Sequence, residues 1–192
     1  MTMRIILYIP GLGDHNLRGQ RLVLAAWRRR GLRVEICQMN WNDKQPFEPK
    51  LRKIIDRIDA LVAQGHIVSL VGVSAGASAA VHAFARRSDK LAKLVLICGA
   101  IQHPEEVGED TKRENPAFWE SMLALHDGVL DKLTDIERRK IVSFVPKSDD
   151  VVNPKNMRID GIGYESLPTH GHVQSIAYAI TVGARRIIKK AY

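Results

Sequence analysis

The sequence has no apolar segment long enough to cross a membrane. A transmembrane helix needs about 20 predominantly apolar residues, whereas the first apolar run extends only from Ile5 to Ile9 before Pro10 and Gly11 end it. The run is also too short for the apolar region of a secretory signal peptide. We therefore interpret it as a buried strand and expect a cytoplasmic protein.

The sequence is also poor in cysteine, with only Cys37 and Cys98. Each ends an apolar run, which is typical of cysteine used as a small buried hydrophobic residue, and a disulfide is unusual in a reducing compartment. No Cys or His spacing matches a structural zinc site. The lysine of a phosphate-binding loop is missing, and no Gly-x-Gly-x-x-Gly follows a predicted strand. These absences argue against a disulfide framework, a zinc site and the common nucleotide-binding loops.

Positive charge is in excess, with 29 Lys and Arg against 21 Asp and Glu and a net charge of +8. Several basic clusters end predicted helices, where cations complement the helix dipole; an anionic partner is the alternative interpretation. No basic stripe with interleaved aromatic residues is present, so we expect no nucleic-acid partner. The clusters are Arg28–Arg30, Arg86–Arg87, Arg138–Lys140, Arg185–Arg186 and Lys189–Lys190.

Short apolar runs alternate with amphipathic segments along almost the whole chain. The runs are rich in Val, Ile and Leu without strict polar–apolar alternation, which is typical of strands buried on both faces of a parallel sheet. Repeated strand–helix units predict right-handed crossovers and a three-layer α/β/α sandwich. The expected strands are residues 4–9, 33–37, 67–73, 93–98, 140–145 and, more weakly, 164–167, and the expected helices are residues 17–30, 48–64, 75–87 and 172–190.

Residues 102–139 interrupt this alternation because they carry no strand signal. Two helices are expected there, near residues 117–126 and 129–140. The segment is either an ordinary crossover with an extra helix or a short cap over the site. Because we find no linker or internal repeat, we expect residues 1–192 to form one domain that includes this segment. A cap would offer an apolar substrate the side chains of Phe118, Trp119, Met122 and Leu123.

The run at positions 72–76 reads Gly-Val-Ser-Ala-Gly and carries the strongest chemical signal. An apolar strand leads into it and small, helix-compatible residues lead out, which is the context of a nucleophile elbow, a strained strand-to-helix turn that exposes a serine. Neighbouring chain passes close to such a turn, so the positions two before and two after Ser74 must lack side chains. Gly72 and Gly76 meet this need, and the motif therefore predicts Ser74 as a nucleophile.

On this motif and its context, the chain resembles the compact α/β-hydrolases, small serine hydrolases that have no large lid and lack the first two strands of the full fold. The resemblance covers residues 4–190. It implies a mainly parallel six-stranded sheet in the order 2-1-3-4-5-6, with the elbow after the third strand. It also implies an acid after the penultimate strand and a histidine that opens the last helix.

These implied positions contain two candidates each. After the strand at 140–145, the register of the family's acid loop selects Asp149, and Asp150 is the neighbouring alternative. In the last loop, the base that follows a glycine is His172, with His170 as the alternative. A serine needs such a base within hydrogen-bond reach, and the base needs an orienting acid.

The resemblance also implies an oxyanion hole made of two backbone N–H groups. One is that of Ala75, directly after the nucleophile, and the other is that of Leu12, in the loop after the first strand. Gly11 and His15 in the same region are further candidates for substrate contact, although His15 and its neighbours are also suited to capping the next helix.

Together these residues predict an esterase-like serine hydrolase that acts on a small-molecule acyl substrate through an acyl-serine intermediate and needs no metal or organic cofactor. A thioesterase, amidase or acyltransferase with the same three residues is an alternative, because the triad does not distinguish these activities. A non-catalytic binding or scaffold protein of the same fold is another. The sequence does not predict the substrate or the oligomeric state.

Overall fold

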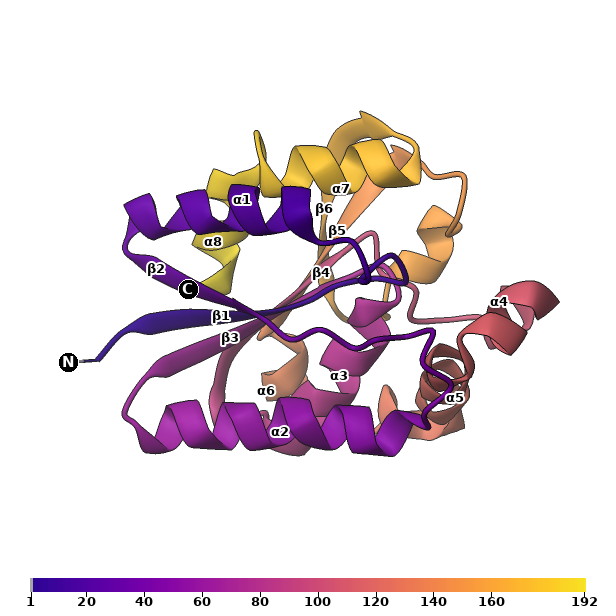
Figure 1. The fold of residues 1–192 in the computed structure, drawn as a ribbon, viewed down its shortest axis with the longest axis horizontal. Coiled ribbons are helices and arrows are strands. Elements are labelled where there is room, and N and C mark those ends of the chain that lie inside the picture. The colour runs from indigo at the N-terminus through magenta and orange to yellow at the C-terminus, as the bar shows by residue number, and fades with distance from the viewer. Residues whose placement is uncertain (1) are drawn as a thin grey trace.

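A computed structural model describes residues 2–192, except for the side chain of Arg30. Its centre is a six-stranded sheet in the order β2-β1-β3-β4-β5-β6, in which every pair of neighbours is parallel (Figure 1). This is the predicted fold class and strand order. The strands are β1 (Arg4–Ile9), β2 (Leu32–Ile36), β3 (Ile67–Val73), β4 (Leu91–Ile97), β5 (Ile141–Ser148) and β6 (Gly163–His170).

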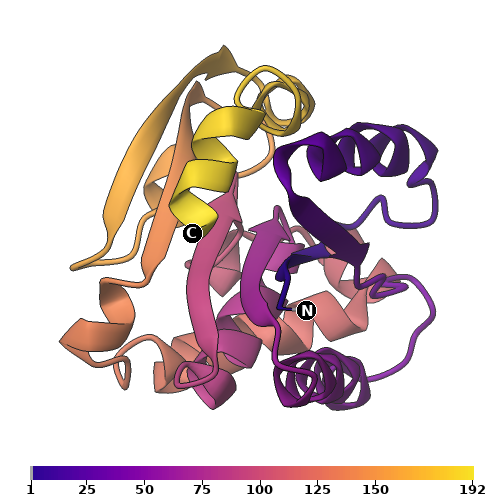
Figure 2. The ribbon, with the colours of Figure 1, turned by 90° about the vertical axis from the view of Figure 1, so that its left-hand side faces the viewer.

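Helices cover both faces of the sheet, as Figure 2 shows along the strands. On one face lie α1 (Arg18–Ala26), α7 (His172–Ile180) and α8 (Ala184–Ala191) (Figure 1). On the other lie α2 (Phe47–Ala63), α3 (Gly76–Arg87) and the single-turn α6 (Asp135–Arg138). Each face has its own apolar core, and this double coverage explains why the central strands are apolar without alternation.

Two helices lie beyond the carboxyl ends of the strands, α4 (Glu109–Glu114) and α5 (Pro116–Ala124) (Figure 1). The remaining helical elements are short turns: η1 (Trp27–Arg30), η2 (Pro104–Glu106), η3 (Leu125–Val129) and η4 (Pro154–Met157). The chain passes from α1 through η1 to Gly31, whose φ of 73° gives the left-handed end expected of that glycine.

The prediction of one continuous C-terminal helix over 172–190 is wrong. Thr181 adopts φ −105° and ψ −87°, outside the helical region, and the chain restarts as α8. The Gly183 N–H donates to Tyr178 O, five residues back, at 2.8 Å, which closes the wide turn between α7 and α8. As a result, Arg185 and Arg186 lie in the first turn of a helix rather than at the end of one.

The predicted helix over 129–140 is also largely absent. Gly128, with φ 100°, ends the preceding turn, and only α6 is helical. Thr134 begins α6 with a capping box, because its side chain accepts from Glu137 N while the Glu137 carboxylate accepts from Thr134 N. This local pair overrides the helical pattern that the apolar spacing suggested.

Most basic clusters have acidic or backbone partners. Arg86 pairs with Glu48 and Arg87 with Asp59 at the end of α3. Glu165 of β6 accepts from both Arg186 and Lys190 of α8, and Arg138 donates to the carbonyl groups of Leu130 and Leu133. Part of the positive charge is therefore compensated within the fold.

Candidate active site

Ser74 occupies the sharp turn between β3 and α3, at the carboxyl end of the sheet. Its φ is +53°, a left-handed conformation that costs a residue with a side chain about 1–2 kcal/mol. Backbone bonds hold the turn: Ser74 N donates to Ile97 O at 3.0 Å, and Ser74 O accepts from Ala77 N at 2.9 Å and Ala100 N at 3.2 Å. The neighbouring strand β4 thus maintains the strained turn.

The two glycines around the turn are required by close packing. A Cβ atom at Gly72 would lie 2.6 Å from Ala80 Cβ on α3. A Cβ atom at Gly76 would overlap the carbonyl oxygens of Ile9 and Pro10 at the end of β1. Since real Cβ atoms do not approach so closely, only glycine lets α3 pack tightly against the strands at these positions.

His172 lies between Ser74 and Asp149. Its Nε2 is 2.8 Å from Ser74 Oγ and its Nδ1 is 2.8 Å from Asp149 Oδ2. An ionised carboxylate only accepts hydrogen bonds, so Nδ1–H donates to Asp149, and the neutral imidazole then accepts from the Ser74 hydroxyl at Nε2. Three loops at the carboxyl ends of β3, β5 and β6 bring these side chains together.

The Asp149 side chain is fully buried, yet it remains suited to carry charge. Burial raises the pKa of its carboxyl, but hydrogen bonds from His172 and from the N–H groups of Val152 and Val151 outweigh this effect. The net pKa lies below the usual value for aspartate, so the carboxylate is ionised near neutral pH and orients the imidazole.

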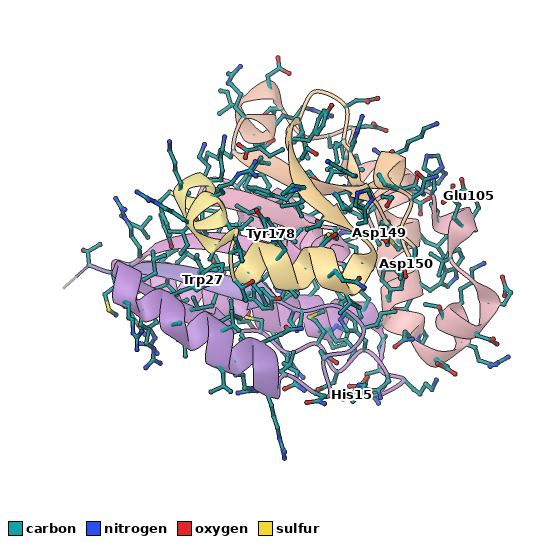
Figure 3. The ribbon with its side chains drawn as sticks, turned by 90° about the horizontal axis from the view of Figure 1, so that it is seen from above. His15, Trp27, Glu105, Asp149, Asp150 and Tyr178 are labelled. Atoms are coloured by element: carbon teal, nitrogen blue, oxygen red, sulfur yellow. The ribbon has the colours of Figure 1, made fainter. Side chains whose placement is uncertain are left out.

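The two alternatives raised by the sequence take other positions. Asp150 accepts from the backbone N–H of His172 at 2.7 Å and so holds the start of α7. His170 contacts Ser148 Oγ at 2.8 Å instead of Ser74. Figure 3 shows Asp149 and Asp150 side by side near the beginning of α7. The hydrogen-bonded set therefore contains Asp149 and His172.

Leu12 and Ala75 both lie beside Ser74. Within residues 2–192, neither of their backbone N–H groups has a hydrogen-bond acceptor in the protein. Gly11 also approaches the serine, because a Cβ atom there would lie 2.9 Å from Ser74 Cβ. The loop after β1 can therefore offer a free N–H group next to the serine.

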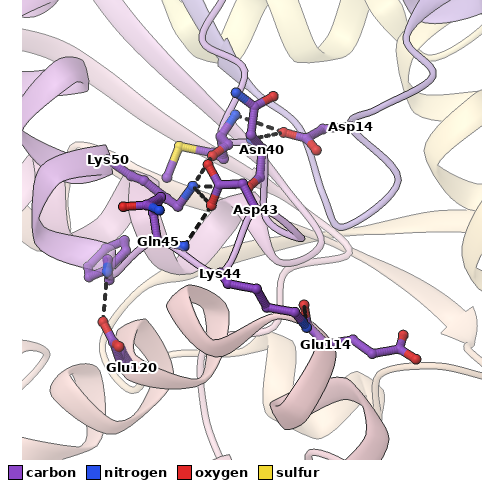
Figure 4. A network of polar contacts seen from close by, with 10 residues as sticks. Asp14, Asn40, Asp43, Lys44, Gln45, Lys50, Glu114 and Glu120 are labelled. Atoms are coloured by element: carbon purple, nitrogen blue, oxygen red, sulfur yellow. Dashed lines mark hydrogen bonds and ion pairs between the residues drawn. The ribbon is translucent and has the colours of Figure 1, made fainter.

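A segment after β2, which the sequence did not mark as functional, clamps this loop at both ends. Trp41 Nε1 donates to Pro10 O at 3.1 Å. The buried Asp14 carboxylate accepts from Met39 N at 2.8 Å and Asn40 N at 2.6 Å (Figure 4). These residues follow no recognisable motif, because the contacts join parts of the chain about 25–31 residues apart.

Lys50 of α2 holds the clamping segment in turn. Its Nζ donates to the carbonyl groups of Met39 and Asn40 and to Asp43 Oδ1, at 2.6–2.9 Å (Figure 4). The side chain is only 4% exposed. A buried lysine with three acceptors, one of them ionised, is a strong anchor.

Ser74 opens into two cavities. The first, which we call the α5 pocket, has a volume of about 140 Å³ and is lined by Leu12, Ala75, Ala100, Phe118, Met122 and Val152 among others. The second, the α1–α7 groove, has a volume of about 500 Å³ and is lined by Val23, Val73, His172, Ile176, Ala177 and Ile180 among others.

Three of the predicted substrate contacts, Trp119, Leu123 and His15, lie outside both cavities. Phe118 and Met122, four residues apart, share one face of α5 and line the α5 pocket. Trp119 lies on the next face, where Lys112 Nζ is 4.3 Å from its ring centroid. His15 is exposed and lines neither cavity. Helical geometry thus separates Trp119 from its neighbours.

Over residues 2–192, no three His, Cys, Asp or Glu side chains are grouped so as to hold a metal ion. In the same part of the chain, no helix combines the length and the apolar character that crossing a bilayer requires.

Structural comparison identifies the fold. No protein-family model matches the chain, and no curated protein matches it in sequence. Among solved structures it is similar to a carboxyl esterase from the fungus Tuber melanosporum, with a TM-score of 0.70, 13% identity, and coverage of 100% of this chain and 80% of the esterase. It is also similar to a monoacylglycerol lipase from Paleococcus ferrophilus, with a TM-score of 0.63, 11% identity, and coverage of 100% and 96%.

A thioesterase domain from the curacin biosynthetic pathway is similar as well, with a TM-score of 0.62, 15% identity, and coverage of 97% of this chain and 91% of the domain. The chain therefore has the α/β-hydrolase fold in a minimal, six-stranded form. Because these identities are low, the likeness concerns the fold, and the chemistry has to be argued from the site.

Proposed function

We propose that this protein is a serine hydrolase that cleaves an ester or related acyl bond through an acyl-serine intermediate. The observation that carries the proposal is the hydrogen-bonded chain from Ser74 through His172 to the buried, ionised Asp149. A serine on a strained turn, a base at 2.8 Å and an acid that orients the base are the three requirements for nucleophilic acyl transfer.

In the proposed mechanism, Ser74 Oγ attacks the acyl carbon while His172 Nε2 takes the hydroxyl proton. Asp149 stabilises the imidazolium that forms. The free N–H groups of Leu12 and Ala75 stabilise the oxyanion, a contribution that is usually among the largest in acyl transfer. His172 then protonates the leaving group, and a water molecule, activated by the same histidine, releases the acid and restores Ser74.

We further propose that the chain acts as one hydrolase domain in which residues 102–139 close one side of the site. Two of the predicted contacts, Phe118 and Met122, support this role because they line the cavity beside Ser74. A thioester is a second candidate substrate, since a thioesterase domain is among the structural neighbours and the same mechanism cleaves both bonds.

The experiment is turnover of a short p-nitrophenyl ester together with labelling by a fluorophosphonate. We expect both with the native protein and neither with Ser74→Ala, whereas Ser166→Ala, which removes an exposed hydroxyl from β6, should behave as the native protein does. Circular dichroism would verify that both variants fold. No turnover of oxygen esters or thioesters, combined with no labelling of Ser74, would refute the proposal and favour a non-catalytic protein.

A further inference from the structure

The two cavities beside Ser74 differ in which catalytic group they reach. His172 lines the α1–α7 groove, and Ala75 lines the α5 pocket. Their positions follow from the fold, because α7 and α1 cover one face of the sheet while α3 and α5 lie toward the other (Figure 1). A substrate bound across Ser74 therefore has one part on each side, in different surroundings.

The position of His172 decides which part of a substrate lies on which side. In acyl transfer the imidazolium gives its proton to the departing group, so that group must lie within reach of His172 Nε2. Of the two cavities, the α1–α7 groove is the one lined by this histidine. The departing alcohol or thiol thus belongs in the groove, and the acyl group belongs in the α5 pocket.

The α5 pocket is small and its wall is held in place. Ser121 of α5 and Ser78 of α3 are joined by a buried hydrogen bond of 2.6 Å between their hydroxyl groups, and Ser78 Oγ also donates to Ala75 O at 2.8 Å. Phe118 packs edge-on against the buried Trp41, with ring centroids 6.0 Å apart. These contacts tie the α5 wall of the pocket to α3 and Trp41, so the pocket cannot easily enlarge on this side.

The volume of this pocket limits the acyl group. At about 140 Å³, it is close to the roughly 150 Å³ of a protein cavity that holds one benzene molecule. An acyl group of about six carbons or fewer fits such a space. A longer chain would have to displace Phe118 or Met122, which are 4% and 1% exposed, or extend along the polar part of the lining, where His103, Glu106 and Asn156 disfavour an apolar chain.

The α1–α7 groove is larger and apolar. Its volume of about 500 Å³ lies within the range of roughly 300–1,000 Å³ that is typical of small-molecule sites. Its lining contains no Asp, Glu, Lys or Arg, and His172 is its one titratable side chain. An apolar, uncharged group is therefore favoured over a charged or strongly hydrated one, because the groove offers no partner for a buried charge.

We infer that the substrate is an ester or thioester of a short acyl group with a larger, uncharged and apolar alcohol or thiol. This inference rests on the proposed function and adds the substrate class to it. The Ser74 Oγ–acyl bond forms as the acyl–leaving-group bond breaks, and the Ser74 proton passes through His172 to the departing oxygen or sulfur. Hydrolysis by water then releases a short carboxylic acid.

Two ester series test this assignment by measurement of kcat/KM. In the first, p-nitrophenyl esters carry acyl groups from acetyl to dodecanoyl; in the second, acetate esters carry n-alkyl alcohols from ethyl to decyl. We expect the first series to fall about tenfold or more beyond roughly six carbons. The second should rise by up to about fourfold for each methylene that the groove buries.

Paired variants make the test specific to each cavity. Met122→Ala should extend the acyl range by several carbons and leave the order of the alcohol series unchanged. Ala177→Phe, at an exposed position of α7 that tolerates a larger side chain, should fill the groove and lower activity on the longer alcohols. It should also lower the p-nitrophenyl series by one common factor, because p-nitrophenol departs through the same groove, and leave the acyl length at which that series falls unchanged. Leu123→Ala on the outer face of α5 is the matched control and should alter neither series.

The outcomes separate this inference from the proposed function. A preference for long acyl chains with small alcohols, or a shift by Ala177→Phe of the acyl length at which the first series falls, would overturn the inference while the protein remained a hydrolase. Loss of the short-acyl limit in Met122→Ala would support it, and if that variant fails to fold, Ala177→Phe alone still decides. No turnover of either series and no fluorophosphonate labelling would refute the proposed function itself.

Discussion

The strained backbone at Ser74 leads to a prediction about stability. Ser74→Gly and Ser74→Ala both remove the hydroxyl and its hydrogen bond to His172. They differ only in the Cβ atom, which is unfavourable at φ +53°. A left-handed conformation costs alanine about 1–2 kcal/mol, whereas glycine loses about 0.4–1 kcal/mol through its more flexible unfolded state. We therefore expect Ser74→Gly to be more stable than Ser74→Ala by about 0.5–1 kcal/mol.

Ser78 supplies the matched comparison because it lies within α3, in helical backbone without the left-handed conformation of Ser74. There the order should reverse, since glycine in a helix is about 0.5–1 kcal/mol less favourable than alanine. Denaturant unfolding of the four variants, with equal m-values, measures both differences. If Ser74→Ala were as stable as Ser74→Gly, the argument that the turn stores backbone strain would be refuted.

Three further predictions concern the residues around the serine. Gly76→Ala should lower the free energy of unfolding by about 1–3 kcal/mol and reduce activity, because the added methyl group overlaps the carbonyl oxygens of Ile9 and Pro10 at the end of β1. Asp149→Asn should lower kcat roughly 10⁴-fold. Folding lowers the pKa of Asp149, so its ionised carboxylate stabilises the folded protein above the unfolded pKa of about 3.9. This stabilisation is lost as the pH falls through the folded pKa, and Asp149→Asn should not show that loss. Asp14→Ala leaves two N–H groups of the clamping segment without their acceptor, which should cost about 1–3 kcal/mol for each buried group and slow fluorophosphonate labelling of Ser74.

Each of these predictions has a control in the same chain. Gly163→Ala adds a methyl group where nothing lies within 4 Å, so it should be nearly neutral. Asp150→Asn leaves the contact between Asp149 and His172 intact and should cost far less activity; equal losses from the two substitutions would contradict the assigned role of Asp149. Asp131→Ala removes an exposed carboxylate, and a labelling rate as slow as that of Asp14→Ala would contradict the role of the clamp.

The local pattern of the sequence was sufficient for the strands and the elbow. The predicted bounds of β1 and β3 agree with the structure, because a short apolar run with a clear end, at Pro10 in one case and at Ser74 in the other, identifies a buried strand without reference to the rest of the chain. The need for Gly72 and Gly76 was predicted for the same reason, since a tight strand-to-helix turn has one steric requirement wherever it occurs.

The resemblance favoured Asp149 over Asp150 and His172 over His170, but only the tertiary structure shows that this aspartate and this histidine meet. Asp149 and Asp150 are equally acidic in the sequence, but successive side chains point in different directions, and only the packing of β5 against β6 determines which one faces His172. The clamp formed by Asp14, Trp41 and Lys50 was equally invisible, because it depends on contacts between distant segments. Local sterics and the hydrophobic pattern of the sequence therefore determined the strands and the position of the nucleophile. The contacts of Ser74 with its partners, and the two cavities beside it, depended on how remote loops pack at the carboxyl edge of the sheet.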